Sequence, residues 1–276
     1  MAEIGGRRVM AGLGLRVATG LALALAAVLV VLLAPLWALT LVVAAIAALA
    51  MREYLRLALP ELTGAPRALA LALAAAVPPA ALAGGGGLAG ALGLGLVLSA
   101  LLCLVGGGEP AAIQRRCLTL GWGLFYTAGL VSCYLLLAAH PHGRALILFG
   151  VAAVVAADSG AYFAGHLAGR HRLAPSLSPG KTWEGLAGGL LLAALVGAAF
   201  AGLWLNDTTA PAGAALALAL GAVSVVGDLL ESVLKRAGGA KDSGTLLPGH
   251  GGMLDRVDGI IAAAPLLLLC RELWWR

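Results

Sequence analysis

Long uncharged stretches separated by short charged segments dominate the chain. Residues 17–51 contain no charged side chain, and Pro35 divides them into two stretches of about 17 residues, near the lower limit for a membrane-spanning helix. Further apolar runs cover residues 68–108, 117–139, 145–165, 185–205, 212–230 and 259–275. The glycines at 84–87 interrupt the first of these runs and predict a turn between two helices. The pattern predicts about nine spans.

The composition indicates that these helices lie in lipid. The chain is 61% hydrophobic and 11% charged, with a mean hydropathy of +0.99, far from the balance of a soluble globule or a disordered chain. The alternation typical of a membrane β-barrel is absent, and helices are the other way to satisfy backbone amides in hydrocarbon. The predicted fold class is therefore all-α, a polytopic transmembrane helical bundle.

Basic residues predict the orientation. With nine spans and a cytoplasmic N-terminus, all 18 Lys and Arg residues except Arg144, Arg271 and Arg276 fall on the cytoplasmic side, as the positive-inside rule requires. The first span resembles a signal peptide, but a second apolar segment follows at once, so we expect it to be retained. The net charge of +5 is scattered between apolar runs and forms no stripe, which argues against a nucleic-acid partner.

Acidic residues gather near the C-terminus. Five of the 13 lie between positions 228 and 258: Asp228, Glu231, Asp242, Asp255 and Asp258. If the helix over 212–230 continues through Lys235, then residues 228, 231, 232 and 235 share one face. Asp255 and Asp258 are likewise three residues apart at the start of the last helix. Carboxylates next to lipid are costly and commonly mark a functional path.

These residues are suited to a site for a metal and phosphate. Carboxylates and the Ser232 hydroxyl offer the oxygen ligands that Mg²⁺ prefers. Four cations could hold phosphates: Lys235, Arg236, Lys241 and Arg256. Three glycines would let backbone approach them: Gly249, Gly251 and Gly252. On composition alone, an ordinary cytoplasmic loop with internal ion pairs explains the region equally well.

A second polar segment runs from Asp158 to Gly185. Asp158 and Tyr162 share a helix face, and a Pro-Gly turn is surrounded by Ser178, Lys181, Thr182 and Glu184. Residues 182–184 can begin the next helix, whose N-terminus favours an anion. Gly-Lys-Thr is not a P-loop, because the required earlier glycine falls at Pro175 and we expect no preceding strand.

The sequence contains no motif for zinc binding or for acyl transfer. The spacing of His166, His171 and His250 matches no zinc motif, and the four cysteines form no C-x-x-C pair. No Ser-His-Asp or Cys-His arrangement emerges.

The stretch from Ser232 to Asp258, SVLKRAGGAKDSGTLLPGHGGMLDRVD, resembles the signature of phosphatidate cytidylyltransferases, also called CDP-diacylglycerol synthases. The strings ADSGAYFAG and SPGKTWEG resemble the same family, in the same order, although His166 stands where the family more often has Arg. The resemblance implies transfer of a cytidylyl group from CTP to phosphatidic acid in phospholipid biosynthesis, with Mg²⁺ and, in some members, a monovalent cation such as K⁺. It also implies a homodimer in the lipid bilayer, which we expect to be a bacterial inner membrane with the active site facing the cytoplasm.

Residue roles follow from the residues and this resemblance together. The expected metal ligands are Asp228, Asp255 and Ser232. The expected catalytic residues are Lys181, Lys235, Lys241, Arg256 and Asp258. The expected substrate-binding residues are Asp158, Ser178, Glu184, Arg236, Asp242, His250, Gly251 and Gly252. Residues 1–150 then supply the N-terminal transmembrane helices, and residues 151–276 the catalytic region with its cytoplasmic loops.

Two other functions compete with this prediction. Residues 255–259 spell D-x-x-D-G, as in CDP-alcohol phosphotransferases, but that family continues with an Ala-Arg pair and two more aspartates, whereas Ile260 and Ile261 lead into an apolar helix. A transporter would carry such carboxylates near the bilayer midplane and show repeat symmetry. Here the carboxylates gather near one interface, and no long repeat is visible.

Overall fold

The structure is a computed structural model that describes residues 25–205, 208–246 and 251–274. The first part of the chain forms a helix over residues 25–33, α2 (Leu36–Ala58), α3 (Gly64–Ala80), the 3-10 turn η1 (Ala81–Ala83), α4 (Gly84–Val105), α5 (Pro110–Leu124), the π-helical turn η2 (Phe125–Gly129) and α6 (Leu130–Ala138). The second part forms α7 (Gly143–Ala168), β1 (Arg172–Ala174), β2 (Ser178–Thr182), α8 (Trp183–Trp204), α9 (Ala210–Ala237) and α10 (Leu254–Trp274).

Several expected boundaries are confirmed. Pro35 separates the first two described helices, because its ring fixes φ and removes a backbone donor. Thr182 caps α8 by accepting a hydrogen bond from the Gly185 amide at 3.0 Å. Helix α9 continues through Lys235 to Ala237, so the polar residues from Asp228 onward do share one helix.

The glycine-rich turn is shorter than expected. Only Gly84 has a left-handed backbone, with φ of 82°, and Gly85, Gly86 and Gly87 already belong to α4. One residue at positive φ suffices to reverse the chain after η1. The following glycines remain helical, which satisfies their backbone groups within the segment.

The expected absence of a strand before Gly180 is wrong. β1 and β2 form a short antiparallel hairpin in which Arg172 pairs with Thr182 and Ala174 with Ser178. The Trp183 amide donates to the His171 carbonyl at 2.9 Å and closes the hairpin against the start of α8. In a P-loop, the Lys and Thr follow the strand in a loop, whereas Lys181 and Thr182 lie within β2. The segment is therefore still not a P-loop, although a strand is present.

Within the described residues, six helical stretches are long and apolar enough to cross a membrane. They are Leu36–Ala58, Gly64–Val105, Pro110–Ala138, Gly143–Ala168, Trp183–Trp204 and Ala210–Ala237. The second stretch contains both α3 and α4, which Gly84 separates. An all-α polytopic membrane protein is therefore confirmed, apart from the small hairpin. The count of nine and the cytoplasmic N-terminus stay predictions, because residues 1–24, which contain the N-terminus and the start of the first expected span, lie outside the described residues.

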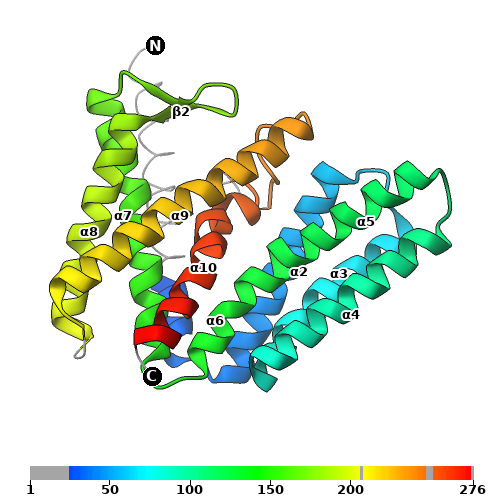
Figure 1. Cartoon of the computed structure of the whole chain (residues 1–276), viewed down its shortest axis with the longest axis horizontal. Helices are drawn as coiled ribbons and strands as arrows, with labels where there is room; N and C mark the ends of the chain where they lie inside the picture. The colour runs from blue at the N-terminus through cyan, green and yellow to red at the C-terminus, as the bar shows by residue number, and fades with distance from the viewer. Residues whose placement is uncertain (1–24, 206–207, 247–250, 275–276) are drawn as a thin grey trace, which may run out of the picture.

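The helices form two groups with α10 between them. In Figure 1, α7, α8 and α9 lie together on the left, α2 to α5 on the right, and α6 below α10. The Tyr134 hydroxyl donates to the Ile260 carbonyl at 2.8 Å and joins α6 to α10. The predicted division at residue 150 falls inside α7 and stays a prediction.

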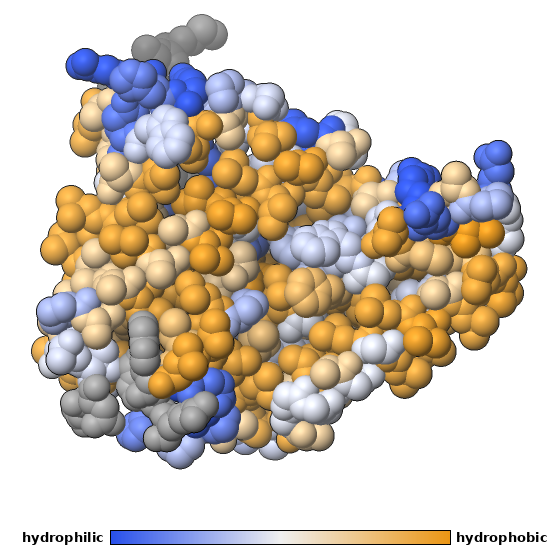
Figure 2. Space-filling model, in the orientation of Figure 1, coloured by the Kyte–Doolittle hydropathy of each residue, from blue (hydrophilic) through white to orange (hydrophobic). Residues whose placement is uncertain are grey.

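Apolar side chains cover the outside. Figure 2 shows hydrophobic residues across the middle of the visible face, while hydrophilic residues gather toward its edges. Trp37, Leu104 and Leu203 are among the large apolar side chains that are exposed. This surface fits a lipid environment.

Candidate active site

The last three turns of α9 carry the polar face that the sequence predicted. Asp228, Glu231 and Lys235 follow one another along the helix, and Ser232 is buried beside them. At Gly227 the two helices come close, since a Cβ atom there would meet the Asp258 carbonyl oxygen of α10 at 2.6 Å. A glycine is therefore needed where α10 passes α9, and this contact brings Asp258 to Asp228.

Three carboxylates meet at this crossing. One oxygen each from Asp228, Glu231 and Asp258 lies within 4.8 Å of the others, and we call this group the carboxylate cluster. The Glu231 side chain is 1% exposed, and its Oε1 atom has no hydrogen-bond partner among the described residues. A buried carboxylate oxygen without a partner is costly. The cluster is thus a place where a cation would be stabilised.

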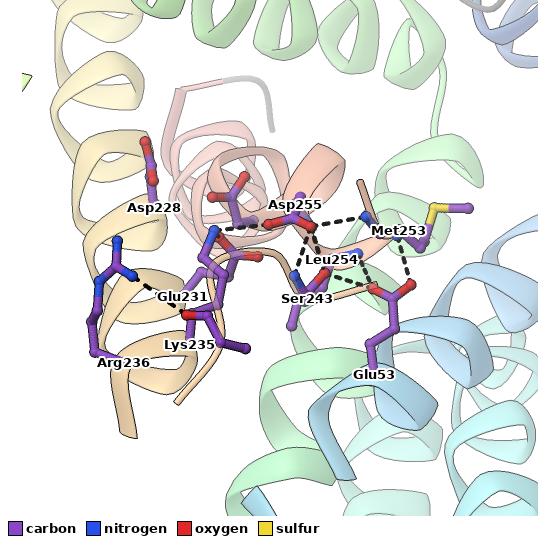
Figure 3. Close-up of polar contacts among 12 residues, drawn as sticks. Glu53, Asp228, Glu231, Lys235, Arg236, Ser243, Met253, Leu254 and Asp255 are labelled. Carbon is purple, nitrogen blue, oxygen red and sulfur yellow. Dashed lines mark hydrogen bonds and ion pairs between the residues drawn. The ribbon is translucent and has the colours of Figure 1, made fainter. Parts of the chain in front are cut away.

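Two lysines already touch the cluster. Lys181 reaches across from β2 and forms an ion pair with Asp228. Lys235 forms ion pairs with Glu231 and with Asp255, the latter at 2.8 Å (Figure 3). Lys181 and Lys235 therefore lie with acidic residues of α9 and α10, and the expected phosphate contacts of the two lysines stay predictions.

Asp255 has a different environment from the one expected. Its carboxylate accepts hydrogen bonds from the Ser243 and Gly252 amides, both at 2.8 Å, in addition to the Lys235 contact. Asp255 is linked to the carboxylate cluster through Lys235, while Glu231 and Asp258 approach Asp228 directly. The metal role of Asp255 and Ser232 stays a prediction, and the geometry adds Glu231 to the candidate ligands.

A pocket of about 280 Å³ adjoins the cluster. It is lined by residues that include Asp158 and Tyr162 of α7, Lys181 and Thr182 of the hairpin, and Asp228 of α9. The predicted shared face of Asp158 and Tyr162 therefore points to the same space as Lys181. The pocket joins the two polar segments that the sequence singled out.

Two of the expected substrate-binding residues bind other parts of the protein. Glu184 pairs with His171 at 2.6 Å and accepts from the Arg170 and His171 amides, which holds the base of the hairpin. Arg236 donates to the Leu177 carbonyl at 3.2 Å, which holds the hairpin against the end of α9. Both contacts position Lys181, and direct substrate binding by either residue stays a prediction.

The remaining expected residues lie in the segment between α9 and α10 or beside it. Lys241, Asp242 and Arg256 are exposed, Ser178 is half-buried at the start of β2, and His250 lies outside the described residues. Gly251 has a φ of 82°. Gly252 is packed against side-chain oxygens of Ser243 and Glu53, which leaves no room for a Cβ atom. Its lack of a side chain therefore serves internal packing in this structure.

Sequence reasoning missed Glu53, Ser243 and Tyr126. Glu53 of α2 is 6% exposed, and its carboxylate binds Ser243, Met253 and Leu254 (Figure 3). Tyr126 is buried in the π-helical turn η2, and its hydroxyl has no hydrogen-bond partner among the described residues. The one available signal for Glu53 was an acidic residue at the end of a long uncharged stretch, between Arg52 and Arg56. Nothing in the sequence indicated a π-helical turn, although such turns are frequent at functional sites.

Comparison with known proteins finds bacterial enzymes that share one name. A phosphatidate cytidylyltransferase of Brucella suis is 49% identical over 156 residues, which is 54% of this chain and 56% of that protein. The enzymes of the same name from Haemophilus influenzae and Pseudomonas aeruginosa are 48% identical over 128 residues and 43% identical over 148 residues. These matches cover 45% and 53% of this chain and 44% and 55% of the relatives, so the chain spans about half the length of the curated relatives it matches.

The family model covers more of the chain. A model described as the cytidylyltransferase family matches residues 14–274, a range that contains every helix and both strands of the described structure. The protein therefore belongs to the cytidylyltransferase family.

Proposed function

We propose that the protein transfers a cytidylyl group from CTP to phosphatidic acid, giving CDP-diacylglycerol and pyrophosphate for phospholipid biosynthesis. The observation that carries this proposal is the carboxylate cluster contacted by Lys181 and Lys235 at one end of apolar helices. A nucleotide can reach such a site from water, and a lipid headgroup can reach it from the bilayer. The names of the bacterial relatives support the same reaction.

The chemistry requires alignment and charge compensation. A phosphate monoester has a second pKa of about 6, so the lipid headgroup is already an anionic nucleophile near neutral pH. One of its oxygens forms a bond to the α-phosphorus of CTP. The bond to the bridging oxygen of that phosphorus breaks, and pyrophosphate leaves with the electron pair. Because donor and acceptor are both anions, repulsion between them must be offset.

The residues fit a bound magnesium ion. Asp228, Glu231 and Asp258 would hold it, with Glu231 Oε1 gaining the partner that it lacks. The ion would supply positive charge against the phosphates of CTP. Asp255 and Ser232 are further proposed ligands of the metal. A second, monovalent cation such as K⁺ is also part of the proposal.

Side chains of the protein supply the other charges. Lys181 lies in the pocket beside Asp228, where it can bind a phosphate oxygen and keep it near the cluster. Lys235 pairs with the carboxylates of both Glu231 and Asp255 and offsets their mutual repulsion. We assign Lys241 and Arg256 to CTP or lipid phosphates, since both are exposed next to the site.

A radiochemical assay tests the reaction. Purified protein is incubated with CTP labelled at the α-phosphate, phosphatidic acid and Mg²⁺, and the label should move into the lipid-soluble fraction. Asp228→Asn should reduce this transfer by more than about 100-fold, because it removes a charged oxygen from the cluster. Glu61→Gln is the matched control, since Glu61 is about half exposed and pairs with Arg115 away from the cluster.

The rival transporter makes the opposite prediction. Substrate flux across vesicles without consumption of CTP would contradict the proposed transferase. Full activity of Asp228→Asn would contradict the metal assignment while leaving the reaction intact.

We extend the proposal to location and assembly. The bacterial relatives support a bacterial inner membrane, and the distribution of Lys and Arg supports an active site that faces the cytoplasm. A homodimer is expected from the family resemblance, and the molecular mass of the detergent-solubilised protein in light scattering tests it.

A further inference from the structure

Residues 238–246 and 251–253, the described part of the segment between α9 and α10, form what we call the connection. It includes the proposed phosphate contact Lys241 and is held by a buried side chain from α2. Glu53 of α2 accepts a hydrogen bond from the Met253 amide at 2.9 Å through Oε1. Its Oε2 atom accepts from the Leu254 amide and from the Ser243 hydroxyl, both at 2.8 Å (Figure 3). One carboxylate therefore holds the middle of the connection, at Ser243, and its end, at Met253.

This arrangement also begins α10. Leu254 is the first residue of that helix, and the first amides of a helix have no partner within it. A carboxylate at this position satisfies them and is favoured by the helix dipole. Arg56, one turn after Glu53 on α2, donates to the Ser243 carbonyl at 2.5 Å. Helix α2 thus fixes the connection by two side chains.

The backbone at Gly244 and Gly252 packs closely against the Glu53 carboxylate. A Cβ atom at Gly244 would collide with Glu53 Oε1, and one at Gly252 would collide with Glu53 Oε2. Ser243 is fully buried beside them. The two glycines bring the backbone close enough to Glu53 for short hydrogen bonds.

The contacts continue from Glu53 to the carboxylate cluster. The Ser243 hydroxyl oxygen lies 2.8 Å from Glu53 Oε2 and 2.9 Å from Asp255 Oδ2. Asp255 then pairs with Lys235, and Lys235 pairs with Glu231 of the cluster. Every step of this chain is a direct polar contact between side chains that are less than 15% exposed.

We infer that Glu53 is a positioning residue for CTP binding, which holds the connection and the first turn of α10 in the conformation that presents Asp255 and Arg256 next to the carboxylate cluster. This inference rests on the proposed function for its substrate. Glu53 itself touches neither substrate nor metal in this scheme. It raises the fraction of molecules whose connection is ordered before the nucleotide arrives.

Glu53→Gln tests the inference with almost no change of shape. The amide keeps one acceptor oxygen and places an NH₂ donor against the Met253 amide or the Leu254 amide, so at least one hydrogen bond is lost. If the ordered fraction falls tenfold, the apparent KM for CTP rises about tenfold, because apparent affinity scales with the competent fraction. The kcat should stay within about threefold, since saturating CTP restores the ordered state.

A second readout does not need activity. Amide hydrogen exchange of residues 243–246 and 251–254 should become faster by a similar factor in Glu53→Gln, while exchange in α7 and α8 stays unchanged. Glu53→Asp keeps the charge on a shorter side chain and should fall between wild type and Glu53→Gln. Glu61→Gln, which alters an exposed ion pair, should match wild type in both measurements.

Each outcome decides the inference. A folded Glu53→Gln protein with wild-type KM and wild-type exchange overturns it, as does a fall in kcat alone with unchanged exchange. If Glu53→Gln does not fold, Ser243→Ala takes its place, because it removes the contacts of the Ser243 hydroxyl with Glu53 and Asp255 and keeps both amide contacts of Glu53. Wild-type KM and exchange in Ser243→Ala then overturn the inference. If the wild-type protein does not turn over CTP, the proposed function fails, and exchange alone still tests the role of Glu53.

Discussion

Two aspartates one turn apart on α10 have different tasks in this structure. Asp258 faces Asp228 and Glu231 in the carboxylate cluster. Asp255 binds two backbone amides and Lys235, so most of its acceptor capacity is used by the protein itself. Identical side chains at this spacing are thus distinguished by what packs against each.

We expect substitution of Asp255 on α10 and of Asp228 on α9 to have different effects on stability. Asp255→Asn should abolish turnover and also lower the free energy of unfolding by about 1–3 kcal/mol, because it leaves buried donors without an acceptor. Asp228→Asn should reduce turnover by more than about 100-fold with a smaller effect on stability, since among the described residues its carboxylate pairs with Lys181 and accepts from no backbone amide. Thermal unfolding in detergent measures the difference. Asp242→Asn, at an exposed position, is the stability control, and equal stability of all three variants would contradict this view.

At the scale of elements, small residues decide how closely the helices approach. Helices α7 and α8 meet at glycines: a Cβ atom at Gly189 would collide with the Ala157 carbonyl, and one at Gly160 would meet the Gly188 carbonyl at 2.7 Å. Between lipid-embedded helices, such close backbone contacts provide much of the association energy. The pair also carries the hairpin, because α7 precedes β1 and α8 follows β2.

Alanine substitution should reveal this packing. Gly189→Ala is expected to destabilise the protein by about 1–3 kcal/mol, because the methyl group forces α7 and α8 apart. Gly202→Ala on the same helix should be neutral or slightly stabilising, since no other part of the structure lies within 4 Å of its Cβ position and alanine favours the helix. Thermal unfolding of both variants in the same detergent provides the comparison. A larger loss for Gly202→Ala would show that α7 and α8 are not held in this way.

At the scale of the whole molecule, the polar residues of the site lie at one end of an apolar body. Figures 1 and 2 place the hairpin and the neighbouring hydrophilic residues at the upper edge, above the band of hydrophobic surface. The pocket and the carboxylate cluster belong to the same end as β2, through Lys181. A nucleotide can reach such a site from water, and a lipid headgroup from the bilayer surface.

Orientation can be measured on this basis. In a background without the four native cysteines, Asp242→Cys should react with a membrane-impermeant maleimide from the cytoplasmic side. His142→Cys, in the turn before α7, should react from the opposite side. Inside-out and right-side-out vesicles separate the two. The reverse pattern would contradict the predicted cytoplasmic N-terminus, and labelling of both positions from one side would contradict the predicted number of spans between them.

The sequence by itself determined that the helices lie in lipid, that the fold is helical and which region of the chain carries the site. Uncharged stretches of this length are stable only in lipid, and helical spacing alone places Asp228, Glu231 and Lys235 on one face once α9 is known to continue. Proline and glycine positions fixed several helix ends, since their effects on the backbone are local.

Tertiary structure decided which of these residues meet. The separation of Asp255 from Asp258 depends on Ser243 and Gly252, and the support from Glu53 joins residues that are 190 positions or more apart in sequence. The hairpin that delivers Lys181 also escaped prediction, because two short strands carry too few residues for a clear alternating pattern. Contacts between distant segments depend on how helices cross, and the crossing is set by close packing of small residues across the whole bundle, which no local pattern encodes.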